Sequence, residues 1–366
     1  MKVLIPLLSI KPQSTSSIVY VEGLLPPLVE RLGGDCVVLS TPFLADRIGE
    51  LGCDVVRQPT PNGRIARLLI ARRAVPRVFA DFGADRYLVP DGQLLPTGPR
   101  SPTVITLHHH LNFSQPEGEP LGRRLYWRFW LDDAIRRTAG RADVLIAPSH
   151  AFAEEFEELV PESRGRLRVV SHGVHPSFSP EAAPAPPEPT PSLLVIGNPS
   201  PYKNVVVACD AFARLASSIP HRLELVGLTE EDLDRLGQGR GWSDEARRRM
   251  APLGGPPRQE LPGLLRRADV LLHPSRVESF GLPVLEALAC GTPVACSALP
   301  SLRELTDGAA ALAPVNDAEA LAAAVSELLA EAESDAATRR DRGLAIAAAR
   351  SWAACAGAVA DLLAES

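Results

Sequence analysis

The chain has 366 residues and a formal net charge of −6. Its length exceeds what one hydrophobic core usually supports, so two domains are expected. The excess of acidic residues argues against a nucleic-acid-binding protein, for which a basic domain is typical.

The six cysteines, at positions 36, 53, 209, 290, 296 and 355, form no Cys-x-x-Cys pair. Most lie in apolar runs, which indicates buried thiols in a reducing compartment rather than a disulfide framework. The first ten residues have the wrong flanks for a signal peptide, and no apolar run reaches the length of a membrane span. We therefore expect a cytoplasmic protein.

In the first half of the chain, short apolar runs alternate with helical patterns. Buried strands are predicted near 3–10, 36–40, 54–57, 86–90, 103–107, 143–147 and 167–171. Helices are predicted at 18–32, 64–75, 123–138 and 150–160. Such alternation is typical of a parallel sheet with helices on its faces.

A proline-rich stretch, 179–191, separates the two halves. Because proline fits neither a helix interior nor a central strand, this stretch is predicted to be a semi-rigid linker between a domain of residues 1–178 and a domain of residues 192–345.

The second half repeats the pattern of the first. Strands are predicted near 193–196, 223–226, 270–273, 293–296 and 310–313, and helices at 205–217, 259–267 and 282–290, with an alanine-rich helical tail from Ala318. The fold class is therefore α/β, with two Rossmann-like domains and ligands expected at the carboxyl ends of the strands.

The segment from Glu278 to Glu286 carries the most informative chemistry. Two carboxylates lie eight positions apart, one before a turn at Gly281 and one inside the helix that follows. The amino end of a helix attracts anions, most naturally phosphate, and ionised carboxylates accept hydrogen bonds from hydroxyl groups. The segment is thus suited to a ligand with phosphate in the middle and hydroxyl groups on both sides, which is the composition of a nucleotide sugar.

Lys203 is the only lysine after residue 11. It lies between the predicted strand at 193–196 and a helix for which Asn204 is the expected N-cap. An ammonium group at such a strand-to-helix turn can neutralise a diphosphate.

The run from Pro274 to Val294, PSRVESFGLPVLEALACGTPV, resembles the signature of family 4 of the retaining glycosyltransferases. The resemblance implies a GT-B fold, with two Rossmann-like domains whose parallel sheets face across a cleft. It assigns the acceptor side to 1–178 and the nucleotide sugar to 192–345. It also implies that the terminal helix, within 346–366, packs on the first domain, with Trp352 as its anchor.

The same resemblance implies roles for single residues. Glu286 is expected to hold the donor ribose, and Glu278 is expected to be a catalytic residue that holds the sugar ring. Lys203 matches the phosphate-binding lysine. The remaining donor-binding positions are Gly197, Asn198, Ser279, Phe280, Gly281 and Leu282. Many relatives carry an arginine near this lysine, where the chain has Asn198 and Tyr202.

His108 is the expected catalytic residue of the first half. It begins His108-His109-His110, directly after the strand predicted at 103–107, and matches a histidine that reaches the donor sugar in the family. Its imidazole can bond a sugar hydroxyl or the acceptor near neutral pH. A metal site or a polar loop without a role remain alternatives, although consecutive residues rarely converge on one ion.

Two further segments have competing interpretations. Asp232-Leu233-Asp234 has the spacing of a metal-binding motif of other glycosyltransferases, but Thr229 as an N-cap explains these acids locally, and no metal is expected. The basic-aromatic stretch 123–137 can contact anionic lipid or a lipid-linked acceptor, although inward packing of its aromatic residues is favoured.

The sequence therefore predicts a metal-independent, retaining hexosyltransferase that uses a nucleotide-diphosphate sugar, without other cofactors. Its hydroxyl acceptor is expected to be a glycan, a lipid-linked molecule or a secondary metabolite. The alternative from another class is a non-catalytic GT-B protein that binds a nucleotide sugar or supports a partner enzyme. A sugar-phosphate synthase or a nucleotide-sugar epimerase on the same fold is a weaker third option.

Overall fold

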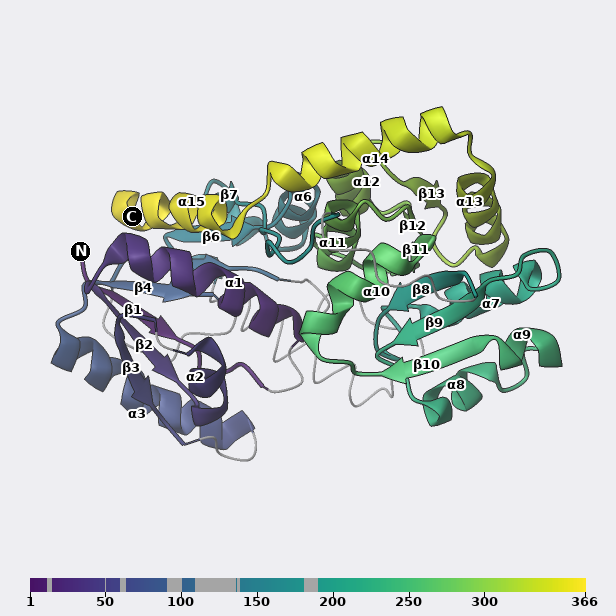
Figure 1. Ribbon diagram of the computed structural model, residues 1–366. Coiled ribbons are helices and arrows are strands. Elements are labelled where there is room, and N and C mark those ends of the chain that lie inside the picture. Colours follow the sequence, from purple (N-terminus) through teal and green to yellow (C-terminus); the bar gives the residue numbers. More distant parts are fainter. Residues whose placement is uncertain are drawn as a thin grey trace. The chain divides into compact units, whose positions relative to one another are not determined.

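The computed structural model describes residues 1–11, 15–49, 51–59, 64–90, 101–108, 136, 139–180 and 190–366. The chain divides into two compact units, Met1–Gly173 together with Arg350–Ser366, and Val174–Ala349. Each unit is built on one parallel sheet flanked by helices (Figure 1).

The first unit contains a seven-stranded sheet in the order β3-β2-β1-β4-β5-β6-β7. Its strands are β1 (Val3–Pro6), β2 (Cys36–Ser40), β3 (Asp54–Arg57), β4 (Arg86–Val89), β5 (Thr103–Thr106), β6 (Val144–Ala147) and β7 (Leu167–Val169). Its described helices are α1 (Thr15–Leu32), α2 (Pro42–Ile48), α3 (Arg64–Phe82), α6 (His150–Leu159), the 3-10 turn η2 (Pro161–Ser163) and α15 (Trp352–Glu365).

Alternate residues of these strands face opposite layers of helices. On one face, Leu4 and Tyr87 pack with side chains of α3, and Ile105 packs with side chains of α6. On the other face, Thr106 bonds Tyr20 of α1, and α15 lies against α1 and β5 (Figure 1).

The terminal helix α15 is fixed by a close fit between glycine and tryptophan. A Cβ atom added at Gly23 would lie 2.2 Å from the Trp352 ring, and one added at Gly173 would lie 2.2 Å from the Trp352 nitrogen. At the far end of α15, Arg86 donates hydrogen bonds to the carbonyl groups of Leu363 and Ser366. The helix is thus an integral layer of the first unit.

The second unit contains a six-stranded parallel sheet in the order β10-β9-β8-β11-β12-β13. Its strands are β8 (Ser192–Ile196), β9 (Arg222–Val226), β10 (Met250–Gly254), β11 (Val270–His273), β12 (Val294–Ser297) and β13 (Ala311–Ala313). Its described helices are α7 (Val205–Leu215), α8 (Glu230–Gly237), α9 (Asp244–Arg248), η3 (Arg258–Glu260), α10 (Leu261–Arg267), α11 (Leu282–Cys290), α12 (Pro300–Thr306), α13 (Ala318–Ala330) and α14 (Glu333–Ala348).

Two hydrophobic cores fill this unit, one on each face of its sheet. Leu193 and Leu272 pack with side chains of α7 and α13, whereas Leu194 and Leu271 pack with side chains of α10 and α11. The alternation of faces along β8 and β11 explains why both strands are apolar throughout.

The predicted α/β alternation is confirmed, with several corrections at the level of elements. The strand predicted at 3–10 ends at Pro6, and β10, α2, α9 and α12 were not predicted. Helix α3 continues through Pro76 to Phe82, because Val75, Val78 and Phe79 bury its apolar face against the sheet. Most of the predicted helix 123–138 and most of the predicted linker 179–191 lie outside the described residues.

Candidate functional site

The two central strands of the second sheet, β8 and β11, bring the predicted donor-binding residues to one edge. These neighbouring strands lie where the strand order reverses, the usual place of ligands in a doubly wound sheet. The turn carrying Gly197 and Lys203 follows β8, and the loop carrying Glu278 follows β11.

Lys203 and Glu278 form an ion pair at this edge. The ammonium Nζ lies 3.1 Å from Oε2 of Glu278, and the two side chains are only 15% and 14% exposed. Burial alone would raise the pKa of Glu278, but the charge of Lys203 and a hydrogen bond from His273 outweigh burial and hold that pKa well below its usual range. Glu278 is therefore an ionised carboxylate.

His273, which the sequence interpretation missed, is the second partner of Glu278. It ends β11, is 1% exposed, and places Nε2 3.2 Å from Oε2 of Glu278. The Ser275 hydroxyl lies 3.2 Å from the same nitrogen. The sequence offered one signal for this role, a histidine at the end of a strand predicted to be buried. A buried histidine needs a hydrogen-bond partner, and the loop that follows this strand carries Glu278.

Glu286 lies on α11 and is 3% exposed. Its Oε1 lies 2.5 Å from a terminal nitrogen of Arg258, whose guanidinium also lies 5.2 Å from the centre of the Phe178 ring. Burial raises the pKa of Glu286, and the nearby Arg258 charge opposes that rise. Arg258, which the sequence interpretation also missed, is thus the countercharge of the second glutamate.

Gly281 shapes the start of α11. Its φ of +102° lies in the left-handed region, and an added Cβ would lie 2.6 Å from Cδ2 of Leu302. Val284 and Leu285 donate the first hydrogen bonds of the helix to the Gly281 carbonyl, so the N–H groups of Gly281 and Leu282 precede the helical ladder. The predicted turn at Gly281 is confirmed, and its geometry requires glycine.

Two family models match the chain, Glycosyltransferase Family 4 over residues 19–178 and Glycosyl transferases group 1 over residues 181–342. The chain belongs to family 4 of the glycosyltransferases. The predicted family and the predicted GT-B fold class are confirmed.

Individual proteins agree with this assignment. O-antigen chain mannosyltransferase B of Escherichia coli is 28% identical over 273 residues, which cover 69% of this chain and 67% of that protein. A D-inositol 3-phosphate glycosyltransferase of Streptosporangium roseum is 35% identical over 181 residues, 44% of this chain but only 41% of that protein. The crystal structure of Anabaena Alr3699/HepE in complex with UDP-glucose superposes with a TM-score of 0.75 at 18% identity, covering 100% of both chains.

Asn204 occupies the predicted N-cap position of α7 in this glycosyltransferase, but its side chain does not cap the helix. Its backbone is left-handed, with φ of +54°, and its side chain makes no capping hydrogen bond. Nδ2 instead donates to the Pro274 carbonyl at 3.0 Å and to Oδ1 of Asn316 at 3.2 Å. Asn204 thereby ties the Lys203 turn to the loop that carries Glu278.

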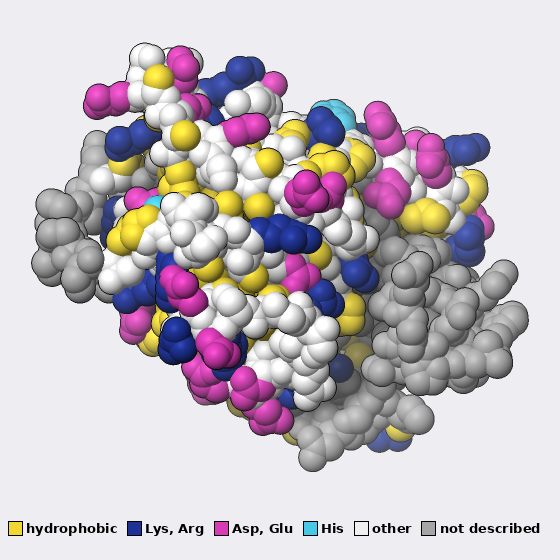
Figure 2. Space-filling view, turned by 90° about the vertical axis from the view of Figure 1, so that its right-hand side faces the viewer, with side chains coloured by type: hydrophobic (Ala, Val, Ile, Leu, Met, Phe, Trp, Pro, Cys, Tyr) yellow, Lys and Arg dark blue, Asp and Glu magenta, His cyan; other side chains and the backbone are white. Residues whose placement is uncertain are grey.

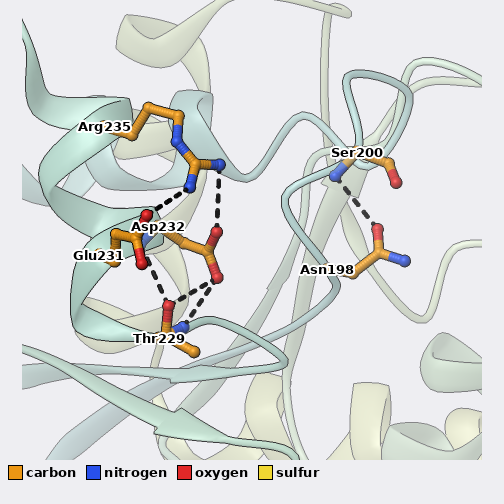
Figure 3. A network of polar contacts seen from close by, with 6 residues as sticks. All are labelled: Asn198, Ser200, Thr229, Glu231, Asp232 and Arg235. Atoms are coloured by element: carbon orange, nitrogen blue, oxygen red, sulfur yellow. Dashed lines mark hydrogen bonds and ion pairs between the residues drawn. The ribbon is translucent and has the colours of Figure 1, made fainter.

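Asn198 and the acidic segment of α8 are engaged locally (Figure 3). Oδ1 of Asn198 accepts a hydrogen bond from the Ser200 nitrogen at 3.2 Å. Asp232 and Thr229 form a capping box, and hydrogen bonds from Thr229, together with the Arg235 charge, lower the pKa of Asp232. The predicted Thr229 cap is confirmed, and in the described part of the chain no three metal-ligating side chains cluster.

His108, in the first unit of this glycosyltransferase, joins a cluster of rings. Its Nε2 lies 2.5 Å from the Pro90 carbonyl, which can only accept, so this nitrogen carries a proton. Its ring centroid lies 4.6 Å from Tyr20 and 5.6 Å from the buried His172. Burial lowers the pKa of His172, and the charge of His108 lowers it further. His109 and His110, the rest of the histidine run, lie outside the described residues.

The stretch 123–137 lies outside the described residues except for Arg136, which pairs with Glu162 at 3.1 Å. No helix that the structure describes has both the length and the apolarity of a membrane span. On the face drawn in Figure 2, coloured side chains of both charges are interspersed rather than gathered by sign.

Proposed function

We propose that this glycosyltransferase moves a hexose from a nucleoside-diphosphate sugar to a hydroxyl acceptor, with retention of anomeric configuration and without a metal ion. The observation that carries the proposal is the buried Lys203–Glu278 pair at the central edge of the second sheet, beside the start of α11. The arrangement offers an ammonium and helix N–H groups to a diphosphate and two carboxylates to hydroxyl groups.

In the proposed mechanism, Lys203 and the N–H groups at Gly281 and Leu282 stabilise negative charge on the departing diphosphate. Electrostatic stabilisation of this kind needs no covalent intermediate on the protein. The ionised Glu278 accepts hydrogen bonds from hydroxyl groups of the sugar ring. Ser279 and Phe280 follow it in the same loop and contribute their main chain to the donor site. Lys203 and the N–H groups at Gly281 and Leu282 thus supply the positive charge that a metal ion supplies in other enzymes.

Glu286 is proposed to bind the ribose hydroxyls of the donor. In the free protein its carboxylate is held by Arg258. Ribose hydroxyls would bind to the lone pairs that this arginine leaves open, since an ionised carboxylate has about four acceptor sites. Gly197 and Asn198 border the diphosphate from the turn after β8.

The donor and acceptor classes are proposed from the relatives. A GDP-mannose:cellobiosyl-diphosphopolyprenol α-mannosyltransferase of Xanthomonas campestris is 27% identical over 233 residues, and Alr3699/HepE has been crystallised with UDP-glucose. Both names support a hexose on a nucleoside diphosphate. The Xanthomonas campestris name supports an acceptor hydroxyl on a glycan or a lipid-linked glycan. His108 is proposed to act in turnover on the acceptor side. The six free cysteines support the cytoplasm as its compartment.

The test is thermal stabilisation by UDP, GDP, ADP and dTDP and their hexose conjugates, with EDTA present throughout. A ligand of the folded state adds about 2.7 kcal/mol at a hundredfold excess over its dissociation constant. We expect a rise in midpoint with one base, a smaller rise in Glu286→Gln, and donor hydrolysis or transfer lost in Glu278→Gln. Stabilisation that persists without any turnover would support the non-catalytic alternative, and no stabilisation by any nucleotide would contradict a preformed donor site.

A further inference from the structure

Two cysteines lie side by side at one edge of the first sheet. Strands β2 and β3 pair in parallel, with Val37 opposite Asp54 and Val38 opposite Val55. Extending this register by one residue places Cys36 opposite Cys53. Because paired residues point to the same face of a sheet, both thiols lie on one side of it.

The two sulfur atoms differ in their surroundings. Cys36 is 1% exposed, whereas Cys53 is half-buried and precedes the edge strand of the sheet. The Cys36 thiol donates a hydrogen bond to the Gly33 carbonyl at 3.8 Å. The neighbouring Cys53 and burial raise the pKa of Cys36, whereas the interaction with Cys36 lowers the pKa of Cys53. The more accessible sulfur is therefore the better nucleophile.

The other four cysteines provide the contrast. These are Cys209, Cys290, Cys296 and Cys355. All four are buried, and burial raises the pKa of each thiol to about 12. Buried thiols of this kind are poor nucleophiles. Cys36 and Cys53 differ from these four because they lie opposite one another on neighbouring strands and Cys53 is accessible. Cys36 is buried as well, but it needs to react only with the sulfur held directly beside it.

We propose that Cys36 and Cys53 form a reversible redox pair that joins β2 to the edge strand β3 by a disulfide. The oxidant is a hydroperoxide. The Cys53 thiolate attacks one peroxide oxygen, the O–O bond breaks, and a sulfenic acid and water form once the leaving oxygen takes a proton. The Cys36 sulfur then attacks the sulfenic sulfur, releasing a second water. In total, two thiols and one hydrogen peroxide give one disulfide and two water molecules.

The backbone permits this bond. Neighbouring strands are about 4.8 Å apart, and disulfides form across Cα separations of roughly 4.4–6.8 Å. Cys53 also follows Gly52, whose φ of +71° lies in the left-handed region, at the turn that enters β3. The pair lies at the amino ends of its strands, opposite to the carboxyl ends where ligands of α/β sheets bind. The bond is therefore expected to stabilise the first unit without entering the donor site.

Peptide mapping after mild oxidation tests the pair directly. The folded, reduced protein is treated with hydrogen peroxide, blocked with N-ethylmaleimide and digested with trypsin. Cleavage after Arg31, Arg47 and Arg57 places the two cysteines on separate peptides, 32–47 and 48–57. We expect these two peptides to be linked, the link to disappear after reduction with dithiothreitol, and two of the six thiols to be lost.

Single variants assign the order of the steps. Cys36→Ser should stop at a sulfenic acid on Cys53, detected by dimedone labelling, whereas Cys53→Ser should give neither label nor link. Cys355→Ser, a buried control, should form the link as the native chain does. Oxidation should raise the thermal midpoint of the native chain and of Cys355→Ser, but not of Cys53→Ser. Unlinked 32–47 and 48–57 peptides after peroxide, or equal oxidation of Cys209 and Cys53, would overturn the proposal.

Discussion

The ammonium of Lys203 lies 3.1 Å from the carboxylate of Glu278, although the two residues are 75 positions apart in the sequence. The contact joins the turn after β8 to the loop after β11, the two strands between which the sheet order reverses. Because both side chains are largely buried, each charge depends on the other for compensation.

Removing either charge alone should therefore destabilise the second unit. For Lys203→Met or Glu278→Gln, we expect a loss of about 3–5 kcal/mol, typical of a buried pair that loses one partner. The double variant should be more stable than the sum of the single effects implies, because it leaves no unpaired charge. Urea denaturation of the four proteins measures this coupling; strictly additive losses would show that the pair does not act as a unit.

His273 is predicted to orient Glu278 rather than to touch the substrate. His273→Leu removes the hydrogen bond to the carboxylate, worth about 1.5–3 kcal/mol for a charged group. We therefore expect a roughly 10–150-fold lower kcat, with a smaller change in nucleotide affinity. His273→Gln keeps a donor of similar reach and should recover part of kcat. Equal kcat in the two variants would contradict a positioning role.

Donor affinity should depend on the ionisation of Glu286. Since burial raises its pKa, Glu286 takes up a proton as the pH falls at values above those of an ordinary carboxyl group. The protonated carboxyl group accepts fewer hydrogen bonds from hydroxyl groups. The affinity for the nucleoside diphosphate should therefore fall as the pH decreases and Glu286 becomes protonated. Arg258→Leu removes the charge that opposes this shift and should move the midpoint to higher pH. Titration calorimetry from pH 5 to 8 measures the shift.

Glu286→Gln is the control for that experiment. It cannot ionise, so its affinity should follow only the protonation of the nucleotide phosphates. A profile identical to that of the native protein would show that Glu286 does not set the pH dependence.

The sequence was sufficient for the sheet pattern and for the turn at Gly281 that opens α11, because both follow from local signals. Apolar runs marked the strands from β1 to β13 except β10. Its segment Met250–Gly254 contains Pro252 and has three half-buried positions and one exposed position. Glu278, Gly281 and Glu286 come from one continuous segment, whose predicted turn and helix the structure confirms. The donor-binding role of the two glutamates stays a prediction.

The partners of these glutamates could not be predicted, because they come from distant parts of the chain. Arg258 lies 28 positions before Glu286 and resembles other arginines of the second half. Asn204 was assigned to a cap by its residue type, yet its side chain bonds Asn316, 112 positions away. Such contacts depend on how loops meet at the sheet edge, which local propensity does not encode.

His172 should make the stability of the first unit depend on pH. Its folded-state pKa is lowered by burial, so between that pKa and about 6.5 the unfolded state binds the extra proton. The free energy of unfolding should then fall as the pH decreases below about 6.5, by up to about 1.4 kcal/mol per pH unit. His172→Phe should flatten this slope between pH 7 and 5 in thermal denaturation. His175→Gln, at an exposed side chain, should keep the native slope.

Replacing Gly281 tests the geometry at the start of α11. Gly281→Ala meets two obstacles, a left-handed backbone and a Cβ only 2.6 Å from Cδ2 of Leu302. Backbone strain alone amounts to about 1–3 kcal/mol, and Leu302 is fully buried, so it has little room to move. We expect a lower thermal midpoint and weaker nucleotide binding, whereas Gly255→Ala, which meets nothing within 4 Å, should change neither.

A second substitution separates these two obstacles. Adding Leu302→Ala to Gly281→Ala removes the clashing methyl group but leaves the backbone strain and opens a cavity. If the clash dominates, the double variant should bind the nucleotide better than Gly281→Ala while remaining less stable than the native protein. If the double variant binds no better, the left-handed backbone itself positions the N–H groups that receive the diphosphate, because relief of the side-chain contact has not restored them.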